Sequence, residues 1–249
     1  GGQGGQGGQG GEGNVDGGGE GGVGGEGGQG GQCKDGGQGR LLKRSAKNLP
    51  RTVLSVTNAA ESPTALLAKK EMLSWKLLQL EPFSLRQPDK FTAPTQLQTD
   101  GSHLAATLYR LAEMDDEEKV YAQVANRLSE LLDDVDRVSV NRDDRRELLT
   151  LMVKSRDGTS HATRYLSDGT MRFLALVVLE LDPKAHGLLC LEEPENGIHP
   201  KRIPKVLRLL QDIATDVEEP IGINNPLRQV IISTHSPAVI QQIPDDCLL

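Results

Sequence analysis

The sequence of 249 residues has only three cysteines and no long apolar run. Cys33, Cys190 and Cys247 are too far apart for a metal-binding motif or a disulfide framework. Neither a run of about 18 apolar residues nor a signal peptide is present. We therefore expect a cytoplasmic protein with no membrane partner.

An excess of positive charge is also lacking. The chain carries 28 Lys and Arg against 35 Asp and Glu, a formal net charge of −7, which argues against a broadly basic nucleic-acid surface. Two local basic clusters lie at residues 40–47 and 201–208. A linker and a solvated helix face explain them better than a DNA contact. The charge therefore gives no support to DNA as a partner.

Glycine is scarce outside the first 39 residues, because 23 of the 29 glycines precede Arg40. Residues 1–39 are GGQ and GGE repeats with almost no apolar side chains, a composition that predicts a disordered low-complexity tail. We expect residues 40–62 to be a linker and residues 63–249 to form one domain with its own core.

Apolar periodicity predicts the elements of that domain. Helices are expected near residues 63–80, 102–111 with Ser102 as its cap, 117–132, 169–181 and 203–214. An extended, proline-broken segment is expected at 83–97, and strands near 138–140, 147–154, 161–165, 188–191 and 229–232. In the last third, helices separate short apolar strands, which indicates a mostly parallel α/β sheet with flanking helices. The preceding helices and β-hairpin predict a small peripheral lobe.

The segment GLLCLEEPENGIHP, residues 187–200, points most clearly to a function. A short apolar run ends in Glu192 and Glu193, at the strand end where open α/β sheets place their ligands. Adjacent carboxylates are costly there unless a cation or a reacting water uses them, and capping of the next segment is the alternative explanation. The pattern favours one acid for a metal ion and its neighbour for a water.

Two further motifs flank this segment in the sequence. YLSDGTMRFLAL, residues 165–176, places Ser, Asp-Gly and Thr before a long apolar helix, whose free N–H groups suit a phosphate. An ordinary capped helix would look the same. VIISTHSP, residues 230–237, is a buried strand that ends near His235. A lone histidine there is usually structural, but at a neighbouring strand end it would reach the same crevice as the glutamates.

Together these motifs resemble the ABC-type ATPase heads of the SMC, RecF and OLD-like group of AAA-family ATPases. The resemblance runs from about Leu66 to the end and implies a P-loop NTPase fold. LSDGT is similar to the signature motif, which in that family contacts the γ-phosphate of ATP held by the opposing protomer. The resemblance assigns this cofactor contact to Leu166, Ser167, Asp168, Gly169 and Thr170.

The resemblance also assigns roles around the acid pair. LLCLEEPENGIHP is similar to the Walker B strand and D-loop, which implies that Glu192 holds Mg²⁺, usually through water. Glu193 would then be the general base, and Asn196 and His199 would lie on the D-loop at a dimer seam. STHSP is similar to the switch-histidine loop, with His235 sensing the γ-phosphate. ATP and Mg²⁺ are the implied cofactors, and a homodimer or a full-length head is the implied partner.

One part of the family pattern is not found. The phosphate-binding loop GxxxxGK[ST] has no match, and the GGQCKDGGQGR segment around Lys34 has the wrong spacing. We therefore expect the carboxyl-terminal part of such a head. No Q-loop residue can be assigned among Gln79, Gln87 and Gln96.

Two functions of different classes follow. The first is Mg-dependent ATP hydrolysis at a dimer interface, with a role in DNA repair or phage defence that rests on family analogy alone. The alternative is a non-hydrolysing interaction protein that presents its signature motif to a full-length partner. The intact acid pair and His235 favour the first, and the unmatched phosphate loop favours the second.

Overall fold

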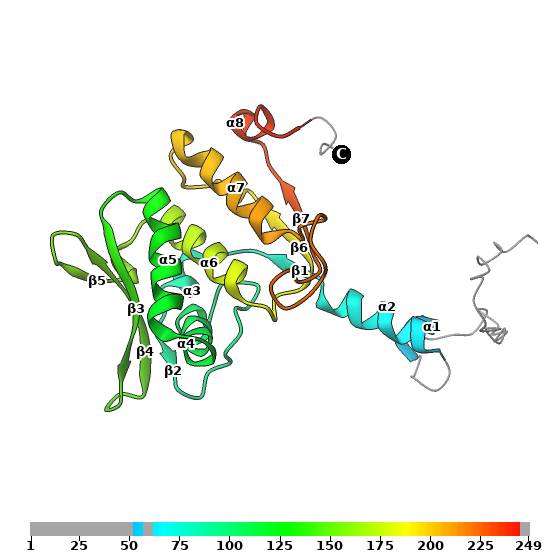
Figure 1. Ribbon diagram of the computed structural model, residues 1–249, viewed down its shortest axis with the longest axis horizontal. Coiled ribbons are helices and arrows are strands. Elements are labelled where there is room, and N and C mark those ends of the chain that lie inside the picture. Colours follow the sequence, from blue (N-terminus) through cyan, green and yellow to red (C-terminus); the bar gives the residue numbers. More distant parts are fainter. Residues whose placement is uncertain (1–51, 57–61, 245–249) are drawn as a thin grey trace, which may run out of the picture. The chain divides into compact units, whose positions relative to one another are not determined.

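The computed structural model describes residues 52–56 and 62–244 (Figure 1). The predicted tail at 1–39 lies outside the described residues, as does most of the predicted linker at 40–62. Within that linker the described part forms a short helix, α1 (Val53–Val56), which contacts α2 (Pro63–Ser74).

The last third of the chain contributes two strands to a parallel three-stranded sheet, and residues 76–78 contribute the third. Its strands are β1 (Lys76–Leu78), β6 (Gly187–Glu192) and β7 (Arg228–Ser233), in the order β1-β6-β7. Leu78 pairs with Leu191, and Glu192 pairs with Ser233, so the carboxyl ends of all three strands lie at one edge. The prediction of an α/β fold with a parallel sheet and flanking helices is confirmed.

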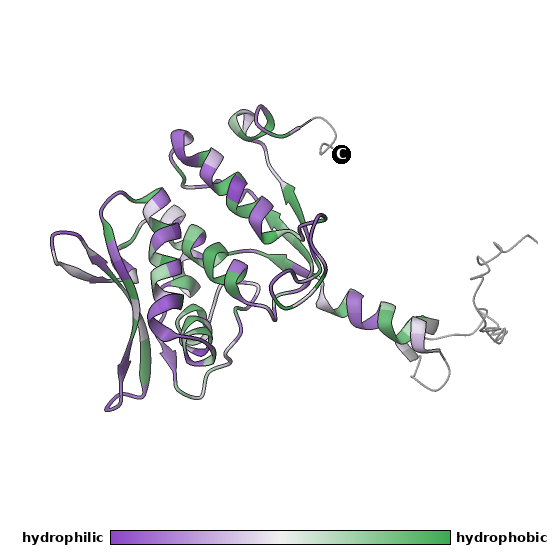
Figure 2. Cartoon of the chain, in the orientation of Figure 1, coloured by the Kyte–Doolittle hydropathy of each residue, from purple (hydrophilic) through white to green (hydrophobic). Residues whose placement is uncertain are grey.

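Helices lie against this sheet, and those of the last third bury their apolar residues in the core. Helix α6 (Asp168–Leu181) is apolar around most of its surface and packs against α7 (Ile203–Ile213), while α7 contacts β7 and α2 contacts β6. Figure 2 shows α6 as mostly hydrophobic, whereas α7 alternates between hydrophobic and hydrophilic residues. An all-round apolar helix belongs inside a domain, and an amphipathic one at its surface.

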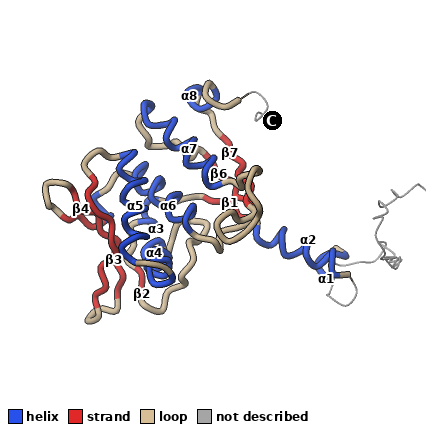
Figure 3. The backbone as a smooth tube through the Cα atoms, viewed as in Figure 1, coloured by secondary structure: helices blue, strands red, loops and turns tan. Residues whose placement is uncertain are grey.

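An antiparallel sheet forms the lobe before α6. Strand β4 (Leu148–Ser155) is central and pairs with β3 (Val135–Asp143), β2 (Asp89–Lys90) and β5 (Ser160–Ala162). Helices α4 (Leu104–Met114) and α5 (Glu117–Leu131) pack on this sheet and also contact α6 (Figure 3). The predicted strand at 161–165 is wrong in part, because β5 ends at Ala162 and a 3-10 turn, Thr163–Tyr165, follows.

The predicted helix at 63–80 is also wrong in its second half. Helix α2 ends at Ser74, Trp75 is extended with ψ 132°, and Lys76–Leu78 forms β1. The leucine spacing suited a helix, but pairing with β6 supplies the backbone hydrogen bonds that a strand needs. Tertiary pairing therefore overrode the local pattern, and it created the third strand of the parallel sheet.

Two further differences concern the segment before α4. Residues 83–97 are not wholly extended, because the helix α3 (Pro82–Leu85) includes the first three of them, whereas β2 within the segment is extended as predicted. Ser102 does not cap α4, since the helix begins at Leu104 after His103, which has a left-handed φ of 65°. The Ser102 backbone N–H and hydroxyl bind Asp100 instead and lower the pKa of that carboxyl.

Buried Asp89 replaces the missing cap. Its Oδ2 accepts a hydrogen bond from the Ala106 N–H at 2.9 Å, and its Oδ1 lies 2.8 Å from His103 Nδ1. A carboxylate near the first turn satisfies a free N–H and suits the helix dipole.

The remaining elements are short. Pro200–Arg202 forms a 3-10 turn before α7, and α8 (Pro237–Ile240) follows β7. Among the described helices, none has both the length and the apolar composition needed to cross a membrane.

Candidate functional site

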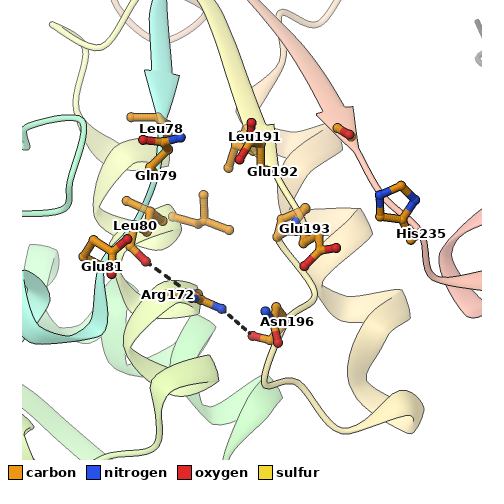
Figure 4. A pocket seen from close by; sticks show the side chains of 13 residues that line it. Leu78, Gln79, Leu80, Glu81, Arg172, Leu191, Glu192, Glu193, Asn196 and His235 are labelled. Carbon is orange, nitrogen blue, oxygen red and sulfur yellow. Dashed lines mark hydrogen bonds between the residues drawn. The ribbon is translucent and has the colours of Figure 1, made fainter.

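A pocket of about 580 Å³ opens at the carboxyl edge of the parallel sheet. The residues at or just after the ends of β1, β6 and β7 line it, together with one side of α6 (Figure 4). Ligands of open α/β sheets bind at this edge, where several strand ends present their side chains together. The pocket is therefore where the predicted chemistry should be found.

Two of its residues are the adjacent acids. Glu192 is the last residue of β6 and is exposed, whereas Glu193 is half-buried and has a left-handed φ of 43°. The Glu193 N–H donates to the Ser233 carbonyl at 2.8 Å, which fixes this turn against β7. A non-glycine residue in this conformation costs about 1–3 kcal/mol and persists only where its surroundings hold it. The strain here coincides with the residue predicted to be the base.

His235 comes from the neighbouring strand. It lies two residues beyond the end of β7, is exposed, and lines the pocket together with Ser233. Figure 4 shows Glu193 and His235 after neighbouring strand ends, beside the same pocket. Two motifs that are about 40 residues apart in sequence are thus brought together by the parallel pairing of β6 with β7.

The structure divides the predicted site residues into two groups. Those that line the pocket are Glu192, Glu193, Asn196 and His235. Those that do not line it are Leu166, Ser167, Asp168, Gly169, Thr170 and His199. His199 caps the 3-10 turn before α7, where its Nδ1 accepts from the Lys201 N–H at 3.3 Å.

The LSDGT residues form the start of α6. Ser167 is the cap, because its Oγ accepts from the Thr170 N–H at 3.2 Å and lies 2.8 Å from the Thr170 hydroxyl. Arg86, just after α3, donates to the Leu166 carbonyl at 2.8 Å and pairs with the exposed Asp168 carboxylate. These contacts within the chain fix the conformation of the LSDGT segment and leave Ser167 and Asp168 exposed.

The start of α6 also packs against the predicted D-loop. A Cβ on Gly169 would lie 2.3 Å from the Gly197 carbonyl oxygen and 2.9 Å from the side chain of Ile198. Gly197 itself has φ +79°, a conformation that favours glycine. The two glycines allow the signature segment and the D-loop to touch backbone to backbone.

We expect Gly169→Ala to lower the free energy of unfolding by about 1–3 kcal/mol, the usual cost of overpacking. The added methyl group would meet backbone atoms that cannot rotate away. Urea denaturation followed by circular dichroism measures the change. Gly222→Ala is the matched control, because nothing lies within 4 Å of its Cβ position. Equal stability of the two variants would contradict the close approach.

Arg172 and Gln79 also line the pocket, and the sequence did not assign them. Arg172 Nε donates to the Leu80 carbonyl at 3.1 Å and its Nη1 donates to the Asn196 carbonyl at 3.0 Å, as Figure 4 shows. In the sequence, the sign that Arg172 has a special role was a single arginine in a mostly apolar helix. Gln79 directly follows β1, so its place was hidden while β1 was predicted to be helical.

Glu195 is the third acid of the LEEPENG segment, and its location was not expected either. It is only 9% exposed, its Oε1 accepts from the Thr234 hydroxyl, and its Oε2 has no hydrogen-bond partner among the described residues. An acid so close to the predicted base was a signal in the sequence, but nothing local indicated that it would be buried.

The donor set at the pocket suits a hard divalent cation. Within residues 52–56 and 62–244, no three His, Cys, Asp or Glu side chains are grouped so that they could hold a metal ion. Mg²⁺ is commonly held by one or two carboxylates, with waters and substrate phosphates as its other ligands. Glu192, exposed at the end of β6, offers a carboxylate of this kind.

A parallel sheet flanked by helices, with acidic residues at its carboxyl edge, is consistent with a P-loop NTPase-like α/β domain. The family model described as "AAA domain, putative AbiEii toxin, Type IV TA system" matches residues 67–241. Since the match covers more than half of the chain, the chain belongs to this AAA domain family, whose domains are ATPase-like and bind nucleotide. No curated protein sequence matches the chain.

Proposed function

We propose that this protein hydrolyses ATP in a Mg²⁺-dependent reaction, with the chemistry in the pocket at the carboxyl edge of the parallel sheet. The observation that carries the proposal is the convergence of Glu193 and His235, from adjacent strands, on one pocket. Phosphoryl transfer needs a residue that orients and deprotonates water and groups that stabilise charge on the γ-phosphate. Both residue types are present at one place.

Each pocket residue has a distinct role in the proposal. Glu193 holds the attacking water and accepts its proton, and His235 donates a hydrogen bond to the γ-phosphate. Glu192 would hold Mg²⁺ through a water, and the ion would neutralise charge on the phosphate oxygens. Arg172 keeps the segments after β1 and β6 at a fixed separation through its two carbonyl contacts.

The position of LSDGT supports a composite site between two protomers. These residues do not line the pocket of their own chain, and Ser167 and Asp168 are exposed. In the proposal they contact the γ-phosphate of a nucleotide held by a second copy or by a full-length head. The same exposure is what the non-hydrolysing alternative needs, since that protein would only present its signature motif to a partner.

The test is steady-state hydrolysis of Mg-ATP by the full chain, together with direct ATP binding. We expect turnover that requires Mg²⁺ and that rises more steeply than linearly with protein concentration. Absence of both turnover and binding at millimolar ATP would overturn the proposal. ATP-dependent association with a full-length homologue, lost on Ser167→Ala and without turnover by the chain itself, would identify the interaction protein instead.

A further inference from the structure

We propose that Glu195 is a positioning residue that fixes the His235 loop relative to the Glu193 turn through its bond with Thr234. The inference rests on the proposed function, because it concerns the same pocket. Glu195 itself does not line the pocket and is not a catalytic residue. Its action is through Thr234, the residue directly before His235.

Glu195 lies within a tightly folded segment. The Asn196 N–H donates to the Glu193 carbonyl at 2.9 Å, and the Ile198 N–H donates to the Glu195 carbonyl at 2.9 Å. Two successive turns therefore begin at Glu193 and at Glu195, with Pro194 between these residues. Because these hydrogen bonds and only one intervening residue link Glu195 to Glu193, a shift of the Glu195 side chain would also move the Glu193 backbone.

Thr234, the residue directly after β7, is also held by hydrogen bonds. Its hydroxyl donates to Glu195 Oε1 and accepts from the Ser236 N–H at 3.0 Å, so one oxygen atom links the β6 segment to both sides of His235. One residue earlier, the Ser233 carbonyl accepts from the Glu193 N–H at 2.8 Å. Two cross-strand bonds, one through the backbone and one through side chains, thus connect the segments that carry Glu193 and His235.

A purely structural role explains Glu195 poorly. The residue is only 9% exposed, yet its Oε2 has no hydrogen-bond partner in the described part of the chain. Burying a polar atom without a partner costs about 1–3 kcal/mol on the protein mutational scale, so an apolar residue of similar volume would serve folding at least as well. An apolar residue at position 195 would, however, lose the hydrogen bond from the Thr234 hydroxyl.

The effect on catalysis follows from geometry. A displacement of about 1 Å in a reacting group can lower the rate by about 100-fold. Loss of the Thr234 bond leaves the backbone bond to Ser233 in place. We therefore expect kcat to fall by about 10-fold or more, with a KM for Mg-ATP that changes by less than about 2-fold, the pattern of an interaction that acts mainly in the transition state.

The variants Glu195→Met, Thr234→Val and Thr234→Ser separate these effects in the full chain. The first two remove the bond, whereas serine keeps the hydroxyl. Turnover should fall in the first two variants and persist in the third. The Glu195→Met/Thr234→Val double variant should be no slower than Thr234→Val alone, since both changes remove the Glu195–Thr234 bond and only Thr234→Val also removes the acceptor of the Ser236 N–H. Thermal unfolding of Glu195→Met should match or exceed that of the wild type.

Two outcomes distinguish this inference from the proposed function. If the wild type hydrolyses ATP but Thr234→Val is as active as Thr234→Ser, the positioning role is wrong and the proposed function stands. If the wild type has no turnover, the test instead measures the NMR signal of the His235 ring. This signal is assigned as the one that disappears in His235→Asn. That signal should move in Glu195→Met and Thr234→Val but not in Thr234→Ser. An unchanged signal in all three variants overturns the inference.

Discussion

Replacing Glu193 by Gln is expected to lower ATP turnover by about 100-fold to 10,000-fold, the range that a positioned general base contributes. The amide keeps the size and hydrogen-bonding reach of the carboxylate but cannot accept the proton of the attacking water. Backbone geometry should be preserved, because the bond that holds this turn comes from the Glu193 N–H and the Ser233 carbonyl. Nucleotide binding should therefore be unchanged while kcat falls.

Single-turnover hydrolysis and equilibrium binding of ATP measure the two effects separately. Glu218→Gln is the matched control, because Glu218 is exposed on the loop between α7 and β7 and does not line the pocket. Glu192→Gln should differ from both, since it should raise the Mg²⁺ concentration needed for half-maximal turnover. If Glu193→Gln retains the wild-type rate, Glu193 is not the base, and another group must activate the water.

The meeting of Glu193 and His235 could be predicted from the sequence because it depends on a general rule. Each residue follows a short apolar strand, and parallel strands place their carboxyl ends at one edge. The strands of the motifs were found to within one or two residues, at 187–192 and 228–233. Strong local patterns therefore sufficed for β6, β7 and the helices that precede them, α6 and α7.

The residues that the sequence missed depend on contacts between distant segments. β1 is only three residues long and becomes a strand through its pairing with β6, so the leucine period before it was misleading. The burial of Glu195 depends on Thr234, which lies 39 residues away in the chain. Arg172 was visible as a charge in an apolar helix, but its two carbonyl partners belong to other elements. Local composition contains none of this information.

The same limitation applies to a buried cluster at the end of α6. Asp182, which caps that helix, pairs with Arg110 of α4 at 2.6 Å, and the two side chains are only 6% and 10% exposed. Arg228, the first residue of β7, donates to the carbonyls of Glu180 and Asp182 at 3.1 and 2.6 Å. Burial lowers the pKa of the Arg228 guanidinium, and the acids around it oppose that shift. The cluster joins the lobe to the parallel sheet.

Replacing Asp182 by Ala should lower the free energy of unfolding by about 3–5 kcal/mol, the usual cost of removing one partner of a buried ion pair. The guanidinium of Arg110 would stay buried next to the Thr95 carbonyl without its counter-charge. The Lys184 N–H, which donates to Asp182 Oδ1 at 3.0 Å, would lose its acceptor as well. Urea denaturation gives the change, because it measures the free energy of unfolding directly.

Two further variants decide whether the buried charge or the surrounding packing causes this loss. Asp133→Ala removes the partner of Arg202 in a surface pair with a separation of 3.7 Å, and its carboxylate is 91% exposed. That change should cost less than about 1 kcal/mol, as exposed pairs do. Adding Arg110→Met to Asp182→Ala removes the unpaired charge and should recover part of the lost stability. A double variant that is less stable than Asp182→Ala alone would show that the Arg110 side chain contributes through packing, and that its pairing with Asp182 is secondary.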